Sequence, residues 1–247
     1  MTGAGTAATR VLRVEQCMGT VFTIDVRGPG VDKKVVDDVI GWLHEMDAIF
    51  STYRPDSPVS RLAAGDLALA GCPGIVREVL DECERFRVST DGFFDYRFSG
   101  ALDPSGYVKG WAIERASEML ERNGSRNHCV NGGGDVQCVG SPQPGEQWTV
   151  GIVDPHHRDQ LVATVSGSRL AVATSGSAER GQHIIDPYTR RAADTYASVT
   201  VVGERISEID VWATAAAAMG ERAEGWLRSQ GLRALLVRPD GTTRTVA

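Results

Sequence analysis

The stretch SEIDVWATAAAAMG, residues 207–220, sets one carboxylate and one hydroxyl among small apolar side chains. Residues four apart on a helix lie one above the other on the same face, so Asp210 and Thr214 would present three oxygens to one point. Such a group of oxygens suits a hard cation. The same letters fit a capping box, with Ser207 as the N-cap and Asp210 at the third helical position. The stretch therefore predicts a helix and leaves a cation site and a helix cap as alternatives.

Strand and helix patterns surround this helix. Residues 11–27 alternate between the two faces of a strand and break at Met18-Gly19, which predicts a pair of strands. Apolar periodicity and helix-stop residues predict helices at 35–50, 75–86, 109–123, 207–219 and 221–229. Short runs between glycines and prolines predict strands at 128–131, 148–153, 161–167, 170–176 and 198–204, followed by a closing hairpin at 232–246.

This order of elements predicts one α+β domain. We expect residues 11–247 to form a single unit of mixed or antiparallel sheets flanked by helices, and an arrangement in two lobes with the ligand site between them stays open. Residues 1–10 are expected to be a disordered N-terminus. No low-complexity linker and no internal repeat divides the chain. With 247 residues, of which 42% are hydrophobic, the chain is long enough to bury a large core.

The composition argues against several classes of protein. A net charge of −6 and the lack of basic blocks give no footprint for nucleic acid. The five cysteines show no C-x-x-C or metal-ligand spacing, which favours reduced thiols in a reducing compartment. Since the sequence shows neither an apolar leader nor an apolar run long enough to span a membrane, we expect a cytoplasmic protein without a membrane anchor.

Three glycine-containing segments are polar enough to line a site. In NGGGDV, residues 131–136, the glycines either aim N–H groups at an anion or form a plain hairpin turn. In DPSGYVKGWA, residues 103–112, Lys109 lies at a junction of loop and helix, where it either meets a phosphate or is solvated. TSGSAERGQHIIDP, residues 174–187, brings two hydroxyls close to His183, without the G-x-S-x-G motif of a serine hydrolase.

The order of these segments resembles that of a known family. Over residues 17–220 the chain contains, in sequence, CMGTVFTIDV, FSTYRPDSPVSRL, GFFDY, LDPSGYVKGWAIERA, VNGGGDVQCVG, ATSGSAERGQHIIDP and EIDVWATAAAAMG. These blocks are similar to the signature blocks of the FAD:protein FMN transferases. Such enzymes cleave the pyrophosphate of FAD and attach FMN through a phosphodiester to a threonine or serine of a target flavoprotein, releasing AMP. The resemblance implies the same Mg²⁺-dependent reaction here, with FAD as substrate and a flavoprotein as acceptor.

The resemblance also implies roles for individual residues. Asp210 and Thr214 would be side-chain ligands of Mg²⁺, and the backbone carbonyl of Gly106 would complete the protein's share. The residues implied to bind FAD are Met18, Tyr53, Phe93, Phe94, Asp95, Asp103, Lys109, Gly133, Asp135, Thr174, His183 and Ile184. The chain departs from the family pattern after Asp95, where only YRFSG precedes the next block.

Catalysis of this kind depends on positioning and on charge stabilisation, which the resemblance assigns to the metal, to Lys109 and to the NGGGDV amides. His183 and Asp210 are the candidate general bases, and coordination to a metal would lower the basicity of Asp210, which favours His183. Two other functions stay open. One is an FAD pyrophosphatase that uses water and yields FMN and AMP, and the other is an FAD-binding protein without turnover.

Overall fold

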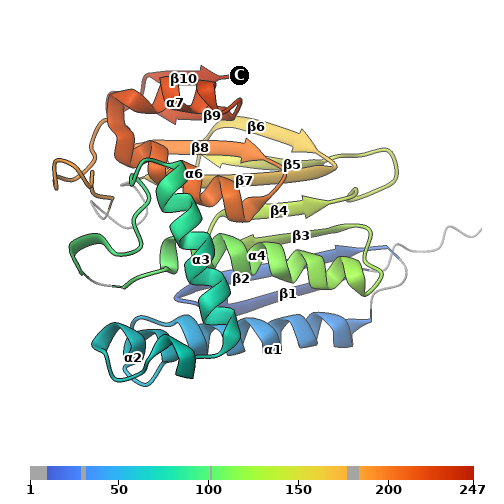
Figure 1. Cartoon of the computed structure of the whole chain (residues 1–247). Helices are drawn as coiled ribbons and strands as arrows, with labels where there is room; N and C mark the ends of the chain where they lie inside the picture. The colour runs from blue at the N-terminus through green and yellow to red at the C-terminus, as the bar shows by residue number, and fades with distance from the viewer. Residues whose placement is uncertain (1–9, 29–31, 101, 177–183) are drawn as a thin grey trace, which may run out of the picture.

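The computed structural model describes residues 10–28, 32–100, 102–176 and 184–247. Its centre is an eight-stranded sheet in the order β1-β2-β3-β4-β7-β8-β9-β10, in which every neighbouring pair is antiparallel (Figure 1). The strands are β1 (Arg10–Cys17), β2 (Thr20–Arg27), β3 (His128–Gly132), β4 (Asp135–Val139), β7 (Arg169–Gly176), β8 (Ser198–Gly203), β9 (Arg233–Val237) and β10 (Thr243–Val246). A separate antiparallel hairpin joins β5 (Trp148–Val153) to β6 (Leu161–Gly167).

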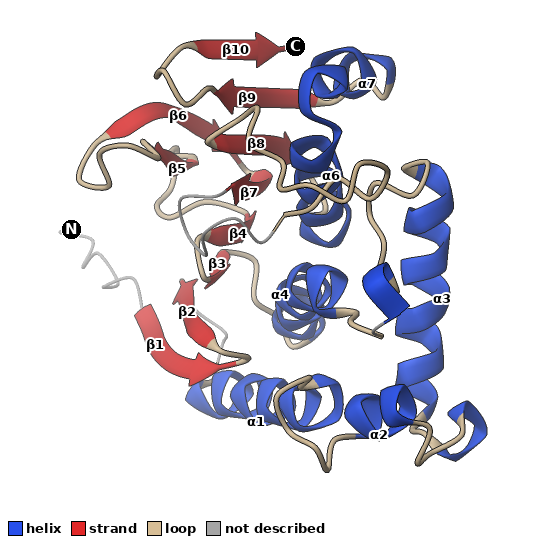
Figure 2. Cartoon of the chain, turned by 90° about the vertical axis from the view of Figure 1, so that its left-hand side faces the viewer, coloured by secondary structure: helices blue, strands red, loops and turns tan. Residues whose placement is uncertain are grey.

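Helices cover one face of this sheet, and the β5–β6 hairpin lies on the other. In Figure 2 the strands stack from β10 to β1, the helices α7, α6, α4 and α1 follow beside them, and α3 lies farther out. The helices are α1 (Lys33–Phe50), α2 (Pro58–Ala64), α3 (Gly74–Ser89), α4 (Ser105–Arg122), α6 (Ile206–Met219) and α7 (Ala223–Ser229). Short 3-10 turns lie at Leu69–Gly71, Phe98–Gly100 and Gly220–Arg222.

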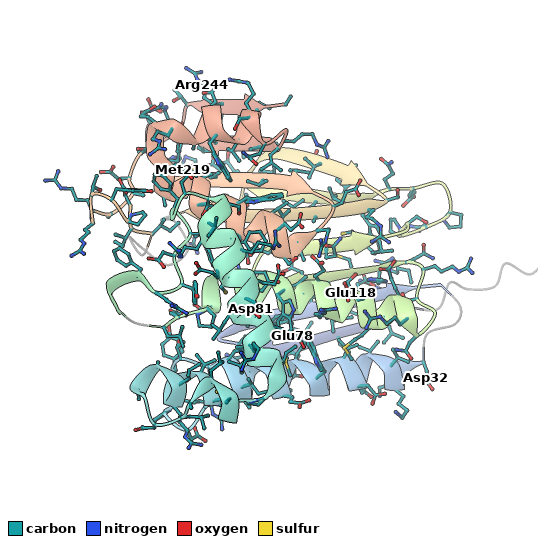
Figure 3. The ribbon with its side chains drawn as sticks, viewed as in Figure 1. Asp32, Glu78, Asp81, Glu118, Met219 and Arg244 are labelled. Carbon is teal, nitrogen blue, oxygen red and sulfur yellow. The ribbon has the colours of Figure 1, made fainter. Side chains whose placement is uncertain are left out.

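The outer helices α1 and α3 form because their apolar residues recur every three or four positions. The side chain of Asp32 caps α1 by accepting a hydrogen bond from the Lys34 N–H at 3.1 Å. Glu78 and Asp81 mark the solvent side of α3 (Figure 3). The buried side of α1 consists of Val36, Val39, Leu43, Met46 and Phe50, and that of α3 of Val76, Val79, Leu80, Cys83 and Phe86.

The helix α6 is buried on nearly all sides, between α4 and the strands β7 and β8. Its alanines let the backbone approach both neighbours closely, which longer side chains would prevent. The predicted helix is therefore confirmed, but the capping-box alternative is wrong. Arg205 precedes the first turn without capping it, and the Ser207 hydroxyl donates a 2.6 Å hydrogen bond to Glu114 of α4.

The structure confirms the α+β class and most predicted elements, and it corrects several details. One large cluster of buried apolar side chains runs from α1 to β10, and a smaller one lies beside the β5–β6 hairpin. The sequence patterns missed α2 and β4, and they placed the start of α4 four residues too late. Arg10 belongs to β1 and pairs with Arg27, so the expected disorder does not reach residue 10. Residues 1–9 lie outside the described residues.

No helix in the described part of the chain is long and apolar enough to cross a membrane.

A buried histidine ties β3 to α4. His128 is fully buried (0% exposed), and its ring nitrogens lie 2.7 Å from the Ser117 hydroxyl and 3.0 Å from the Ser125 hydroxyl. Burial, together with the charge of Arg169, lowers the pKa of His128 to about 4. An unfolded chain would take up a proton at this ring near about pH 6.5. The neutral ring therefore stabilises the fold above about pH 6.5, and this stabilisation is lost as the pH falls toward the folded pKa.

We expect His128→Asn to flatten the acid dependence of stability. Between about pH 6.5 and the folded pKa, wild-type protein should lose about 1.4 kcal/mol more per pH unit than the variant, because only the wild type gains a proton on unfolding. Urea denaturation at a series of pH values measures this difference. His157→Asn, at an exposed position, is the matched control and should keep the wild-type slope. Parallel curves for wild type and His128→Asn would contradict the assignment.

Candidate functional site

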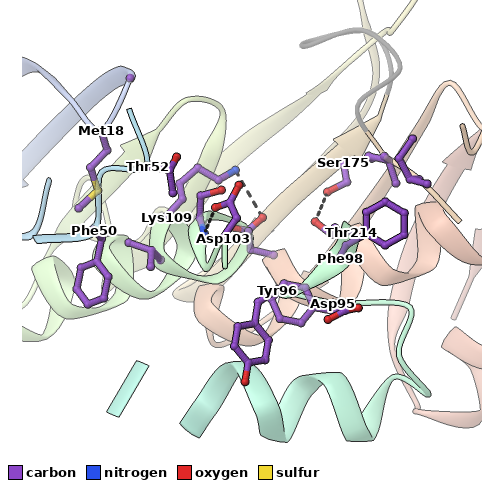
Figure 4. Close-up of a pocket in the computed structure, with 18 of the residues that line it drawn as sticks. Met18, Phe50, Thr52, Asp95, Tyr96, Phe98, Asp103, Lys109, Ser175 and Thr214 are labelled. Carbon is purple, nitrogen blue, oxygen red and sulfur yellow. Dashed lines mark hydrogen bonds and ion pairs between the residues drawn. The ribbon is translucent and has the colours of Figure 1, made fainter. Parts of the chain in front are cut away.

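A cavity of about 710 Å³ opens at one end of the sheet, a size that accommodates a large organic ligand. Its walls come from the β1–β2 turn, the end of α1, the segment after α3, the first turns of α4, the end of β7 and the middle of α6. Aromatic side chains contribute much of the lining, and polar side chains, among them Lys109 and Asp103, lie between them (Figure 4). The aromatic residues are Phe50, Tyr53, Phe93, Phe94, Tyr96 and Phe98.

Three charged side chains meet at the polar wall. Lys109 of α4 forms an ion pair with Asp135 of β4 and lies 3.5 Å from Asp210 of α6, measured from Nζ to Oδ1. Asp135 is buried, and its Oδ1 accepts a 3.0 Å hydrogen bond from the Thr174 N–H of β7. Lys109 and Asp210 line the cavity, whereas Asp135 lies behind them and orients the lysine. The position of Lys109, one turn inside α4, corrects the predicted junction of loop and helix.

Asp210 is 2% exposed, and burial raises the pKa of its carboxyl group, while the Lys109 ammonium opposes that shift. Its Oδ2 has no hydrogen-bond partner in the part of the chain that the structure describes. One turn later on α6, the Thr214 hydroxyl lies 3.0 Å from the Ser175 hydroxyl of β7 (Figure 4). A buried carboxylate oxygen without a partner is costly unless a ligand or ion satisfies it. This cavity wall can therefore accept an oxygen-binding cation.

Within residues 10–28, 32–100, 102–176 and 184–247, no three His, Cys, Asp or Glu side chains gather as a metal-binding group. A cation at Asp210 would thus depend on neutral protein oxygens, on ligand oxygens and on water.

The start of α6 is fixed by two side chains from its neighbours. Glu114 of α4 accepts hydrogen bonds from the N–H of Ser207 at 3.0 Å and from its hydroxyl. Gln137 of β4 accepts a 3.0 Å hydrogen bond from the Ile206 N–H and donates one of 3.0 Å to the Glu204 carbonyl. These long-range contacts satisfy N–H groups of the first turn of α6, as the predicted N-cap would have done. Sequence reasoning missed both residues because no local motif marks them.

The closest approach of α4 to α6 occurs at Gly110. A Cβ at this position would lie 2.8 Å from the Asp210 Cβ and 2.9 Å from the carbonyl oxygen of Ile206. Atoms cannot approach so closely without displacement, so only glycine permits this helix contact. Gly110 therefore sets the place of Asp210 relative to Lys109, although it was not among the predicted site residues.

Most of the predicted site residues come together at this cavity. Those that line it are Met18, Tyr53, Phe93, Phe94, Asp95, Asp103, Gly106, Lys109, Thr174, Ile184, Asp210 and Thr214. Ser175 also lines it and was missed, although its place beside Thr174 in the TSG motif gave a signal. His183 lies outside the described residues.

The NGGGDV segment forms a tight hairpin turn between β3 and β4, which was one of the two structures that its sequence allowed. Gly133 and Gly134 both have positive φ, 63° and 97°, and they form the two-residue turn. The Gly133 N–H donates to the Val21 carbonyl at 3.1 Å, and the Gly134 N–H donates to Asn131 at 3.0 Å. Both N–H groups already have partners, which supports the hairpin interpretation over the anion-binding one. Gly133 also lies outside the described lining of the cavity.

An antiparallel sheet with helices on one face, and a Lys–Asp centre at the wall of a large cavity, define an α+β protein with a ligand-sized site. Residues 18–101 and 96–236 match the model of the ApbE family, and the chain belongs to that family.

Curated relatives carry the name FAD:protein FMN transferase. The protein from Salmonella typhimurium is 29% identical over 151 residues, which cover 57% of this chain and 43% of the relative. The protein from Treponema pallidum is 29% identical over 211 residues, covering 74% and 58% of the two chains. The chain thus matches about half the length of these relatives.

Solved structures share the fold over nearly the whole chain. The ApbE protein from Thermotoga maritima superposes with a TM-score of 0.85 at 20% identity, covering 96% of this chain and 97% of that one. The flavin transferase ApbE from Vibrio cholerae gives a TM-score of 0.81 at 22% identity, covering 98% of each chain.

We expect Gly110→Ala to destabilise the protein by about 1–3 kcal/mol, because overpacking against Asp210 outweighs the better helix propensity of alanine. Gly41→Ala is the matched control, since Gly41 lies in α1 with open space where its Cβ would be. That control should stabilise by about 0.5–1 kcal/mol. Urea denaturation measures both changes. Equal stabilisation by the two substitutions would show that the α4–α6 contact is not tight.

Proposed function

We propose that this chain transfers FMN from FAD to a threonine or serine hydroxyl of a target flavoprotein and releases AMP. Membership of the ApbE family and the names of the curated relatives support this function. The observation that carries it is the centre of Lys109, Asp135 and Asp210 at the wall of a cavity with an aromatic side. Such a cavity offers stacking surface to ring systems and a polar wall to a pyrophosphate.

Magnesium fits the polar wall as the metal of this reaction. The Asp210 oxygen without a partner, the Thr214 hydroxyl and the Gly106 carbonyl are the proposed protein ligands. They are hard oxygen donors, which Mg²⁺ prefers, and so few protein ligands would leave room for phosphate oxygens and water. When bound, the ion would neutralise negative charge on the pyrophosphate.

The other residues of the wall have roles that follow from their contacts. Lys109 presents an ammonium to the cavity, and its ion pair with Asp135 keeps that charge in place toward the phosphates. A lysine held in advance loses little freedom when the transition state forms, which is how positioned charges contribute to catalysis. We assign the general base to His183, since Asp210 would hold the metal and lies 3.5 Å from the Lys109 ammonium.

The proposed FAD contacts come from both sides of the cavity. Tyr53 lines the cavity and is 95% exposed. Its ring is therefore accessible for stacking by a ring of the ligand. Phe93 is fixed from behind by the ring of Tyr188 and by the Arg222 guanidinium, which lies 4.8 Å from its ring centre. Met18, Phe94, Asp95, Asp103, Thr174 and Ile184 complete the proposed set.

The proposed partners are FAD and an acceptor flavoprotein, and the proposed compartment is the cytoplasm. All five cysteines are free thiols in the structure, which agrees with a reducing compartment.

Replacing the metal ligands should abolish turnover and leave the protein folded. We expect Asp210→Asn to lower the rate of AMP release with FAD, Mg²⁺ and acceptor by about 100-fold or more, because a charged ligand is removed. Thr214→Val should cause a smaller loss. Thr149→Val removes the hydroxyl of a similar pair, with Ser166 on the β5–β6 hairpin, and should have no effect. Normal rates of AMP release in the Asp210→Asn variant would contradict the proposal that Asp210 is a metal ligand.

A second experiment decides between transferase, pyrophosphatase and binding protein. Incubation with FAD and Mg²⁺ alone should release little AMP, because transfer requires water to be kept from the position of the acceptor hydroxyl. Adding candidate acceptor flavoproteins should give AMP equal in amount to FMN bound covalently, as measured by chromatography and intact mass. Rapid AMP release that no acceptor increases would identify a pyrophosphatase. Bound FAD without AMP in any mixture would identify a binding protein.

A further inference from the structure

Two cysteines face each other on the side of the sheet that carries the β5–β6 hairpin. Cys129 of β3 pairs in register with Cys138 of β4. Neighbouring side chains such as His128 and Gln137 point to the helix side, where they contact α4 and α6. Because side chains alternate along a strand, both cysteines lie on the opposite face. Cys138 belongs there to a small buried cluster with Trp148, and Cys129 packs against this cluster while half-buried.

The backbone hydrogen bonds show which kind of cross-strand pair the two cysteines form. The Asn127 carbonyl accepts from the Arg27 N–H at 2.8 Å, and the Gly133 N–H donates to the Val21 carbonyl at 3.1 Å. In an antiparallel sheet, alternate residues bond to the same neighbour, so Cys129 also directs its backbone groups to β2. Its pair with the cysteine of β4 therefore lacks backbone hydrogen bonds. Such pairs have Cα atoms about 4.5 Å apart, within the roughly 4.4–6.8 Å that a disulfide spans.

The surroundings of the two cysteines differ, and they indicate which thiol an oxidant would meet first and which would then complete the disulfide. Cys129 is reachable from solvent, and the positive charge of Arg27 is close enough to interact with it. Arg27 is itself held by Asp25, the residue opposite Cys129 on β2. Cys138 is fully buried, and its hydrogen bond with Cys129, followed by burial, raises its pKa strongly. An oxidant reaches a partly exposed thiol first, and a buried thiol follows.

We propose that Cys129 and Cys138 are a redox modification site that forms a reversible disulfide with an oxidised low-molecular-weight thiol, such as glutathione disulfide, as oxidant. The Cys129 thiolate attacks one sulfur of the oxidant, breaks its S–S bond and releases one glutathione thiolate. The Cys138 thiol then gives up its proton, attacks the Cys129 sulfur and releases the second glutathione. The two cysteines lose two electrons, and one glutathione disulfide becomes two glutathione thiols.

The disulfide would join β3 to β4, and β4 also carries residues that hold the polar wall of the cavity. Gln137, next to Cys138, holds the start of α6, and Asp135, on the same strand, holds Lys109. Oxidation would therefore act on the strand that positions both α6 and the lysine. The inference does not depend on the proposed flavin transfer, because the experiment measures oxidation of the two thiols directly.

Intact mass spectrometry of the folded protein with glutathione disulfide tests this inference. Wild type and Cys72→Ser should each lose the mass of two hydrogen atoms, and dithiothreitol should restore it. Cys138→Ser should instead gain one glutathione, attached at Cys129. Cys129→Ser should show neither change at the pair, which makes it the matched control.

Peptide mapping of oxidised wild type locates the bond without relying on any variant. A linked peptide containing residues 129 and 138 is the expected result. No loss of mass, a linkage that involves Cys17, Cys72 or Cys83, or oxidation only between chains would overturn the proposal.

Discussion

Asp210 reaches the wall of the cavity because α4 passes α6 at a glycine. Any side chain at Gly110 would push the two helices apart and would move Asp210 away from Lys109 on the neighbouring helix. The alanines of α6 serve the same close packing on the side of the sheet. Small residues thus bring three charged side chains from α4, α6 and β4 within reach of one another, and the site depends on this packing.

Two acidic side chains and one lysine meet at this centre, and burial raises the pKa of Asp210. Lys109 supplies one positive charge between two buried carboxylates, Asp135 and Asp210, and one oxygen of Asp210 has no partner in the described part of the chain. Buried charge of this kind costs free energy in the absence of a ligand, and a cation or a donor on the ligand side would recover it. A ligand that binds this wall would therefore recover part of that free energy, in a cavity that aromatic side chains also line.

The sequence predicted the elements with strong periodicity and the residues in distinctive local motifs. The break at Met18-Gly19 and the helix around Asp210 follow from such patterns, whereas most of the cavity lining was implied by the resemblance to a family. The two interpretations of the glycine segment could not be separated from the sequence, because the partners of the Gly133 and Gly134 N–H groups come from folding. The roles of Gly110, Glu114 and Gln137 depend on contacts between distant elements, which no local pattern encodes.

The sheet joins parts of the chain that are made far apart in time. β2 pairs with β3, yet α1, α2, α3 and α4 all lie between them in the sequence. During synthesis β2 therefore has no partner on its β3 side until β3 has left the ribosome. Until then Phe22 and Ile24, which are buried in the folded protein, lack part of their surroundings. Closing so long a loop slows folding, because its entropy is lost before the strand pairing compensates. The order of strands thus leaves the β2 edge of the N-terminal hairpin unpaired until late in synthesis.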